Sequence, residues 1–258
     1  MLLVGSNHFR DMWLDLVPQF TLGVEACTAS GEAGTPSGPR PFDVPLARHV
    51  AQALVNAEFD VTISTELQID HGQSHSIQYL LPTVPVVPLV VNVFVPPRPV
   101  LRRCVALGAA LQRAISTFPA TRRVVVVGSG GCRTVSRSPT GAIRTVPTRS
   151  SLVDAWKHGR TLWTEFEQRR RQIVRAFPAG INADFDRSFL AALEQGRALD
   201  YAGYDDATLE HEAGNGAHEL RTWLIAAAAT GGRGRALAYE PMPEWLNGMG
   251  VALAEVAS

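Results

Sequence analysis

The chain has 258 residues, of which 46% are hydrophobic, and its 24 basic and 24 acidic side chains give a formal net charge of zero. This size suits one large domain with a full core, and the neutral balance excludes the strongly basic surface typical of nucleic-acid binders. The three cysteines, Cys27, Cys104 and Cys132, are far apart and form no Cys-x-x-Cys pair. A disulfide framework and a thiolate zinc site are therefore not favoured, and a reducing, cytoplasmic location is expected.

The first half of the chain alternates short apolar runs with helical patterns. We expect strands at Leu2–Val4, Asp60–Ile69, Val86–Val95 and Val124–Val127, and helices at Phe9–Val17, Leu46–Ala57 and Pro99–Thr117. The segment Cys27–Pro45 is rich in Gly, Pro, Ser and Thr, which indicates an excursion loop. The apolar run 84–95 contains two prolines and an asparagine, so it indicates a buried strand and no membrane span. The alternation predicts an α/β fold with a largely parallel or mixed central sheet flanked by helices.

The second half continues with helices. Ser150–Phe177 is predicted to be a helix with six basic residues, which could contact a partner or an anionic surface but more commonly form a solvated face. Phe185–Leu193 and Gly216–Thr230 predict further helices, and the second is Ala-rich and expected to be buried. No repeat or linker divides the chain, so residues 1–258 are expected to form one domain.

Polar residues follow three of the predicted strands. His8 follows the first, Asp70 and His71 follow the second, and the turn Gly128–Gly131 follows the four-valine strand. In open α/β sheets, ligand sites form outside the carboxyl ends of strands. Two imidazoles and a carboxylate there could hold a metal with open positions, as in non-haem iron oxygenases.

Each of these residues also has a simpler explanation. His8 could be a strand-end histidine that bonds the loop backbone, which is the commoner situation for a lone histidine. His71 could ligate a metal, contact a substrate hydroxyl or move a proton, or it could belong to a turn in which Asp70 caps its own backbone and Gly72 allows a sharp bend. Gly128–Gly131 matches no nucleotide-binding motif, and we expect backbone to pass close to an active-site ligand there.

A carboxylate that could complete the set lies near the C-terminal end. Glu219 falls in the first turns of the helix that begins near Gly214–Gly216, on the same face as Trp223. It could be a metal ligand, or a glutamate favoured by the dipole at a helix start. Three neighbours could substitute for it in such a role: His211, Glu212 and His218.

Taken in order, many segments resemble the class III extradiol ring-cleavage dioxygenases, the superfamily of the protocatechuate 4,5-dioxygenase β subunit. They cover nearly the whole chain except about 145–179, which resembles an inserted helical segment. The matching segments are Gly5–His8, Leu16–Gly23, Gly38–Pro41, Asp70–Gly72, Val87–Asn92, Arg102–Gly108, Gly128–Gly131, Ile181–Asn182 with Phe185–Asp186, Glu212–Gly214 and Glu219–Leu224.

The resemblance implies an Fe(II) centre that binds a catechol-type substrate and O₂ and opens the ring next to the two hydroxyls. By position, His8 corresponds to an iron-binding histidine and Glu219 to the iron-binding carboxylate. His71 corresponds to the histidine that handles the substrate and its protons. The implied substrates are phenolic acids such as protocatechuate or gallate.

Two positions depart from the family pattern. The family's other iron-binding histidine would lie upstream of the strand at Leu2, and Thr134 stands where the family has an acid/base histidine. Threonine cannot exchange a proton near neutral pH as imidazole can. In the family, the upstream segment also supplies a strand of the sheet. Without that strand, Leu2–Val4 is expected to have an uncovered neighbour position. The chain could start from an internal codon, or it could be a degenerate homologue whose gap is covered by a partner subunit or a homo-oligomer contact.

The sequence therefore leaves two hypotheses. The first is an Fe(II)-dependent extradiol dioxygenase of a catechol-type aromatic acid, with His8 and Glu219 as ligands and His71 and Thr134 at the catalytic positions. The second is a non-catalytic homologue that acts as an accessory or binding subunit. Neither predicts a nucleic-acid or membrane partner.

Overall fold

The structure, a computed structural model, describes residues 1–9, 12, 16–120, 122–131, 168, 181–243 and 247–254. Thr134 lies outside this part of the chain, as does the segment 145–179 apart from Gln168. The predictions made for them, including the basic helix at Ser150–Phe177, therefore stay predictions.

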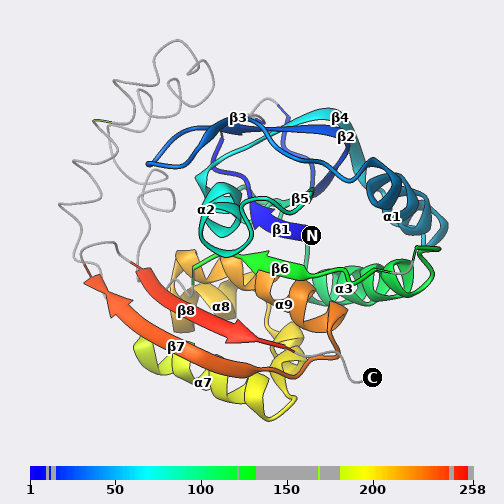
Figure 1. Cartoon of the computed structure of the whole chain (residues 1–258). Helices are drawn as coiled ribbons and strands as arrows, with labels where there is room; N and C mark the ends of the chain where they lie inside the picture. Colours follow the sequence, from blue (N-terminus) through cyan, green and yellow to red (C-terminus); the bar gives the residue numbers. More distant parts are fainter. Residues whose placement is uncertain are drawn as a thin grey trace.

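A mixed sheet forms the centre of the fold (Figure 1). In the described part of the chain it has six strands in the order β3-β2-β5-β1-β6, and β4 pairs with β2 outside that path. The strands are β1 (Leu2–Ser6), β2 (Phe20–Ser30), β3 (Ser37–Pro39), β4 (Thr62–Ile69), β5 (Val87–Val91) and β6 (Val126–Ser129). The predicted α/β fold with a mixed sheet is confirmed.

Strand β1 lies in the interior of this sheet. It pairs in parallel with β5 on one side, where Val4 is opposite Leu89, and with β6 on the other, where Val4 is opposite Gly128. The prediction of an uncovered position beside Leu2–Val4 is therefore wrong, because β1 has a neighbour on each side. Among the described strands, β6 forms the edge of the sheet there.

Helices cover both faces of the sheet. On one face, Leu2 and Val4 belong to a core that also contains residues of α1 (Val44–Asn56), α3 (Leu101–Ser116) and α9 (Leu220–Ala229). On the other face, Leu3 packs in a second core with Ile77 of α2 (His71–Leu80). Successive side chains of a strand point to opposite faces, so Leu2, Leu3 and Val4 of the fully buried β1 contribute to both cores.

The C-terminal third packs beside α3 and α9. It comprises α7 (Ala183–Glu194), the 3₁₀ helix η1 (Ala198–Gly203), α8 (Asp206–Ala213), the 3₁₀ helix η2 (Asn215–Glu219) and a hairpin of β7 (Arg235–Met242) and β8 (Asn247–Leu253). Figure 1 shows this hairpin lying along α7. The Ala-rich α9 is mostly buried, as predicted.

Several elements differ from those predicted. The segment Cys27–Pro45 is not an excursion loop, because β2 runs to Ser30, β3 follows and α1 begins at Val44. Gly31, Gly34 and Pro36 lie in the turn between β2 and β3, whereas Gly38 and Pro39 belong to β3 and Pro45 to α1. Of the helix predicted at Phe9–Val17, the described positions are not helical. The helices α2 and α8 and the β7–β8 hairpin were not anticipated. None of the helices in the described part of the chain combines the length and the apolar composition that crossing a bilayer requires.

Candidate metal centre and active site

The side chain of His8 is the centre of the candidate site. It follows β1, and its Nε2 atom lies 3.6 Å from Oε1 of Glu219 at the end of η2. Its Nδ1 atom lies 3.1 Å from Oδ1 of Asp70, and its backbone N–H donates to Oδ2 of Asp70 at 2.5 Å. The structure thus brings together the imidazole and the carboxylate that the sequence singled out from opposite ends of the chain.

Burial and charge act in opposite directions on this imidazole. Burial alone would lower the pKa of His8, but the carboxylates of Asp70 and Glu219 outweigh it and raise the pKa to about 9. Burial would likewise raise the pKa of Asp70, and the charge and hydrogen bonds of His8 lower it instead. Both carboxylate side chains are only 4% exposed. Two buried carboxylates that face one imidazole favour a positive charge at this place.

Asp70 has a double role that explains its position. It is the N-cap of α2, where its Oδ1 accepts the backbone N–H of Gly72 at 2.9 Å. The same carboxylate also contacts the ring and the backbone N–H of His8, so one side chain both caps α2 and orients His8. The chain does turn sharply here, since β4 ends at Ile69 and α2 begins at His71, but Gly72 has no left-handed φ. It leaves room for His8, because a Cβ atom there would lie 2.5 Å from Cε1 of that ring.

Glu219 is held from two sides. The Ser6 hydroxyl donates to Oε1 at 3.4 Å, and the backbone N–H of Gly131 donates to Oε2 at 2.5 Å. The glycine turn approaches α9 closely, since a Cβ atom at Gly130 would lie 2.6 Å from Oγ1 of Thr222. The glycines were expected to let backbone pass near a ligand. In the structure α9 takes the space beside Gly128 and Gly130, and Asn247 of β8 takes the space beside Gly131. This packing places the Gly131 N–H against Glu219.

His71 lies beside His8, with ring centroids 4.2 Å apart. Possible ligand atoms of His8, Asp70 and His71 all lie within 4.8 Å of one another. The Nδ1 atom of His71 lies 2.8 Å from Oε1 of Glu32, in the turn between β2 and β3. Sequence reasoning missed Glu32, although it is the one charged residue in the segment 27–39.

The residues considered as substitutes for Glu219 lie elsewhere. His218 is fully buried, with Nε2 2.7 Å from Oε1 of Glu210 and Nδ1 2.8 Å from Nη1 of Arg221. Burial, together with the nearby arginines, lowers the pKa of His218 to about 4. His211 and Glu212 are exposed on α8. Of this group, Glu219 alone is placed against His8.

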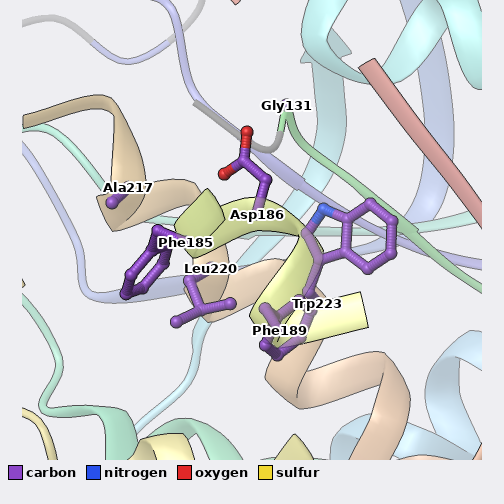
Figure 2. A pocket seen from close by; sticks show the side chains of 7 residues that line it. All are labelled: Gly131, Phe185, Asp186, Phe189, Ala217, Leu220 and Trp223. Carbon is purple, nitrogen blue, oxygen red and sulfur yellow. The ribbon is translucent and has the colours of Figure 1, made fainter. Parts of the chain in front are cut away.

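A small hollow with three aromatic side chains in its walls lies beside Gly131 (Figure 2). Its walls are Gly131, Phe185, Asp186, Phe189, Ala217, Leu220 and Trp223. Asp186 is 3% exposed, and its carboxyl accepts a hydrogen bond from the Tyr239 hydroxyl at 2.6 Å. Burial raises the pKa of Asp186 to about 6, although this hydrogen bond and Arg187 act against it.

Comparison with known proteins gives the chain a family. The family model described as "Catalytic LigB subunit of aromatic ring-opening dioxygenase" matches residues 3–250. A protein of Paraburkholderia xenovorans (strain LB400) is named 2,3-dihydroxyphenylpropionate/2,3-dihydroxicinnamic acid 1,2-dioxygenase. It is 33% identical, over 97% of this chain and 82% of its own. A protein of the same name from Klebsiella pneumoniae (strain 342) is 32% identical, over 97% of this chain and 83% of the length of that protein. A third protein of this name, from Mycobacterium sp. (strain MCS), is 34% identical, over 98% of this chain and 84% of its own length.

A solved structure supports the fold. An uncharacterized protein from Escherichia coli K12 superposes with a TM-score of 0.51 at 16% identity, over 98% of this chain and 85% of that one. On the family match and the relatives together, this chain belongs to the LigB family of extradiol aromatic ring-opening dioxygenases.

Proposed function

We propose that the protein is an Fe(II)-dependent extradiol dioxygenase that opens the ring of a catechol bearing a carboxylate side chain. The observation that carries the proposal is the approach of Nε2 of His8 to Oε1 of Glu219 at 3.6 Å, in a buried setting with excess negative charge.

The donor set fits ferrous iron. Imidazole nitrogen and carboxylate oxygen are the ligand types of the non-haem iron oxygenases. Asp70 binds His8 through Nδ1 and also caps the α2 backbone, whereas Oε1 of Glu219 faces Nε2 of His8 and accepts a long 3.4 Å hydrogen bond from Ser6. His8 and Glu219 are therefore the residues that would hold the ion. When bound, iron would supply the route by which electrons pass from the catechol to O₂.

The surrounding residues would keep these two ligands in position. The Asp70 carboxylate contacts Nδ1 of His8, and this contact directs Nε2 toward Glu219. Histidines oriented by a carboxylate in this way are common around protein metal sites. Phe94 packs on the His8 ring, with centroids 5.2 Å apart, and helps to exclude water. His71, beside His8, would accept a proton from a substrate hydroxyl at Nε2, because Glu32 occupies its Nδ1.

The side chain of the substrate follows from the relatives' names. The resemblance noted in the sequence pointed to protocatechuate or gallate, whereas the relatives are named for catechols that carry a three-carbon acid. We therefore expect 2,3-dihydroxyphenylpropionate to be a better substrate than protocatechuate. We also place the protein in the cytoplasm, which agrees with the free, buried thiols of Cys27 and Cys104.

Oxygen uptake by the full chain tests the proposal. The protein is loaded anaerobically with Fe(II), and uptake is followed with 2,3-dihydroxyphenylpropionate, protocatechuate, gallate and catechol. His8→Ala and Glu219→Gln should lose iron and turnover, while exposed controls, His211→Ala and Glu66→Gln, should keep both. Stoichiometric iron without uptake on any catechol would support the accessory-subunit hypothesis instead. Full iron binding by Glu219→Gln would refute the ligand assignment.

A further inference from the structure

We infer that Glu32 is the positioning residue of His71, and that it fixes the tautomer in which Nδ1 carries the proton and Nε2 is free to accept one. The meaning of this for catalysis rests on the proposed function, whereas the tautomer itself does not.

The contacts of Glu32 define the orientation of the ring. Its Oε1 atom lies 2.8 Å from Nδ1 of His71 and also accepts the His71 backbone N–H at 3.3 Å. One oxygen thus binds the ring and the backbone of the same residue, which restricts rotation of the side chain. An ionised carboxylate only accepts hydrogen bonds, so the ring nitrogen that faces it must carry the hydrogen. In the neutral imidazole the lone pair then lies on Nε2.

The turn that carries Glu32 holds it in place. The carbonyl oxygen of Glu32 accepts the backbone N–H of Thr35 at 3.0 Å and its hydroxyl at 2.7 Å. The two residues between them, Ala33 and Gly34, have φ values of 52° and 79°. Two positive φ values are typical of the tight type I′ turn that joins hairpin strands. An alanine with a left-handed φ is strained, so the surrounding contacts hold this turn in place despite that strain.

The burial of the pair strengthens the effect. The Glu32 side chain is 13% exposed and that of His71 is 34% exposed, so the carboxylate lies largely out of water while the ring keeps an open side. Two further imidazole rings lie near that of His71: His8, at 4.2 Å between centroids, and His75, at 6.3 Å. The free Nε2 is therefore the atom available to a ligand of the site.

The chemical consequence is a single proton transfer. The O–H bond of a substrate hydroxyl breaks and an N–H bond forms at Nε2, while the Nδ1–H of the ring keeps its 2.8 Å contact with Glu32. Residues that orient a catalytic or ligating histidine typically contribute about 10- to 100-fold in activity or affinity. We expect removal of Glu32 to lower kcat by roughly that factor, with KM and iron content close to wild type.

The tautomer can be measured without turnover. In the iron-free full chain with ¹⁵N-labelled histidine, long-range ¹H–¹⁵N spectra in mildly alkaline buffer should show Nδ1 of His71 protonated. Glu32→Ala should move the proton to Nε2, whereas Glu32→Gln keeps an oxygen acceptor and should retain the Nδ1–H form. The matched control is Glu25→Gln, an exposed glutamate of β2 that pairs with Arg48, and it should change nothing.

Kinetics complete the test. A drop in kcat for Glu32→Ala, a smaller drop for Glu32→Gln and an unchanged KM support the positioning role. An unchanged tautomer in Glu32→Ala, or a kcat equal to that of Glu25→Gln, overturns it. If the wild type binds iron but consumes no oxygen, the proposed function fails, and the spectra alone then decide the role of Glu32.

Discussion

Replacing Gly72 with alanine should weaken metal binding without unfolding the protein. Gly72 lies in the first turn of α2, where an alanine is compatible with the backbone. Its added Cβ atom, however, would lie 2.5 Å from Cε1 and 2.7 Å from Nδ1 of His8. Ordinary contact begins at 3.4 Å, so the ring has to move by about 0.9 Å. The displacement falls on the proposed metal ligand.

The size of the effect follows from the His8–Asp70 contact. At 3.1 Å it is already long, and a shift of about 0.9 Å carries it beyond hydrogen-bonding distance. Loss of such an orienting partner typically costs about 10- to 100-fold in metal affinity, which corresponds to about 1.4–2.8 kcal/mol. The helix itself gains up to about 1 kcal/mol from the change of glycine to alanine. We therefore expect a near-normal melting temperature and a raised dissociation constant for the metal.

Anaerobic calorimetric titration with Fe(II) measures the affinity, and circular dichroism measures the thermal stability. Gly203→Ala is the matched control, because its Cβ would meet no atom within 4 Å and its φ is not left-handed. An affinity for Gly72→Ala equal to that of the control would show that His8 does not hold the metal, or that its ring moves at no cost, and either result would contradict this prediction.

Three further changes test the packing and charge of the fold. Because burial raises the pKa of Asp186 from its ordinary 3.8 to about 6, its ionisation destabilises the folded state. The unfolding free energy of wild type relative to Asp186→Asn should therefore be highest below about pH 4 and fall by up to about 3 kcal/mol as the pH rises through 6. Urea titrations across this range check it, and a constant difference would contradict it. Gly108→Ala places a Cβ atom 2.4 Å from the Ile225 carbonyl oxygen and should lower the unfolding free energy, measured by chemical denaturation, by about 1–3 kcal/mol. An unchanged midpoint would mean that α3 and α9 can move apart without cost. Asp43→Ala removes the N-cap that accepts the Leu46 N–H at 3.1 Å and should cost about 1–2 kcal/mol in thermal unfolding, whereas an exposed change such as Asp60→Ala should cost little.

The sequence was informative where one local pattern decides one element. The apolar runs predicted β1, β4, β5 and β6, and helical spacing predicted α1, α3, α7 and α9. The loop prediction for Cys27–Pro45 failed because glycine and proline mark a turn without showing how far the flanking strands extend. Because the segment was interpreted as a loop, Glu32 was not considered as a site residue.

The site could be predicted only in part, because its assembly depends on strand direction. β4 runs in parallel with β2, which is antiparallel to β5, and β5 is parallel to β1. β4 therefore runs opposite to β1, and the rule that carboxyl ends of parallel strands meet does not explain why Asp70 reaches His8. The meeting depends on α2, whose Gln73 amide donates to the carbonyl oxygens of Leu3 and Leu89. Neither that helix nor its docking on β1 left a pattern in the sequence.

Ser6 and Glu219 are hydrogen-bonded although they lie 213 positions apart in the chain. The possible metal-ligand atoms of the site are therefore close together only when β1 and the start of α9 are both folded. An unfolded chain has no such cluster. An ion that binds there would link β1 to the start of α9. It would raise the unfolding free energy by about 2.7 kcal/mol at a free concentration one hundred times its dissociation constant. Chelation should accordingly lower the melting point of the whole domain in one cooperative transition.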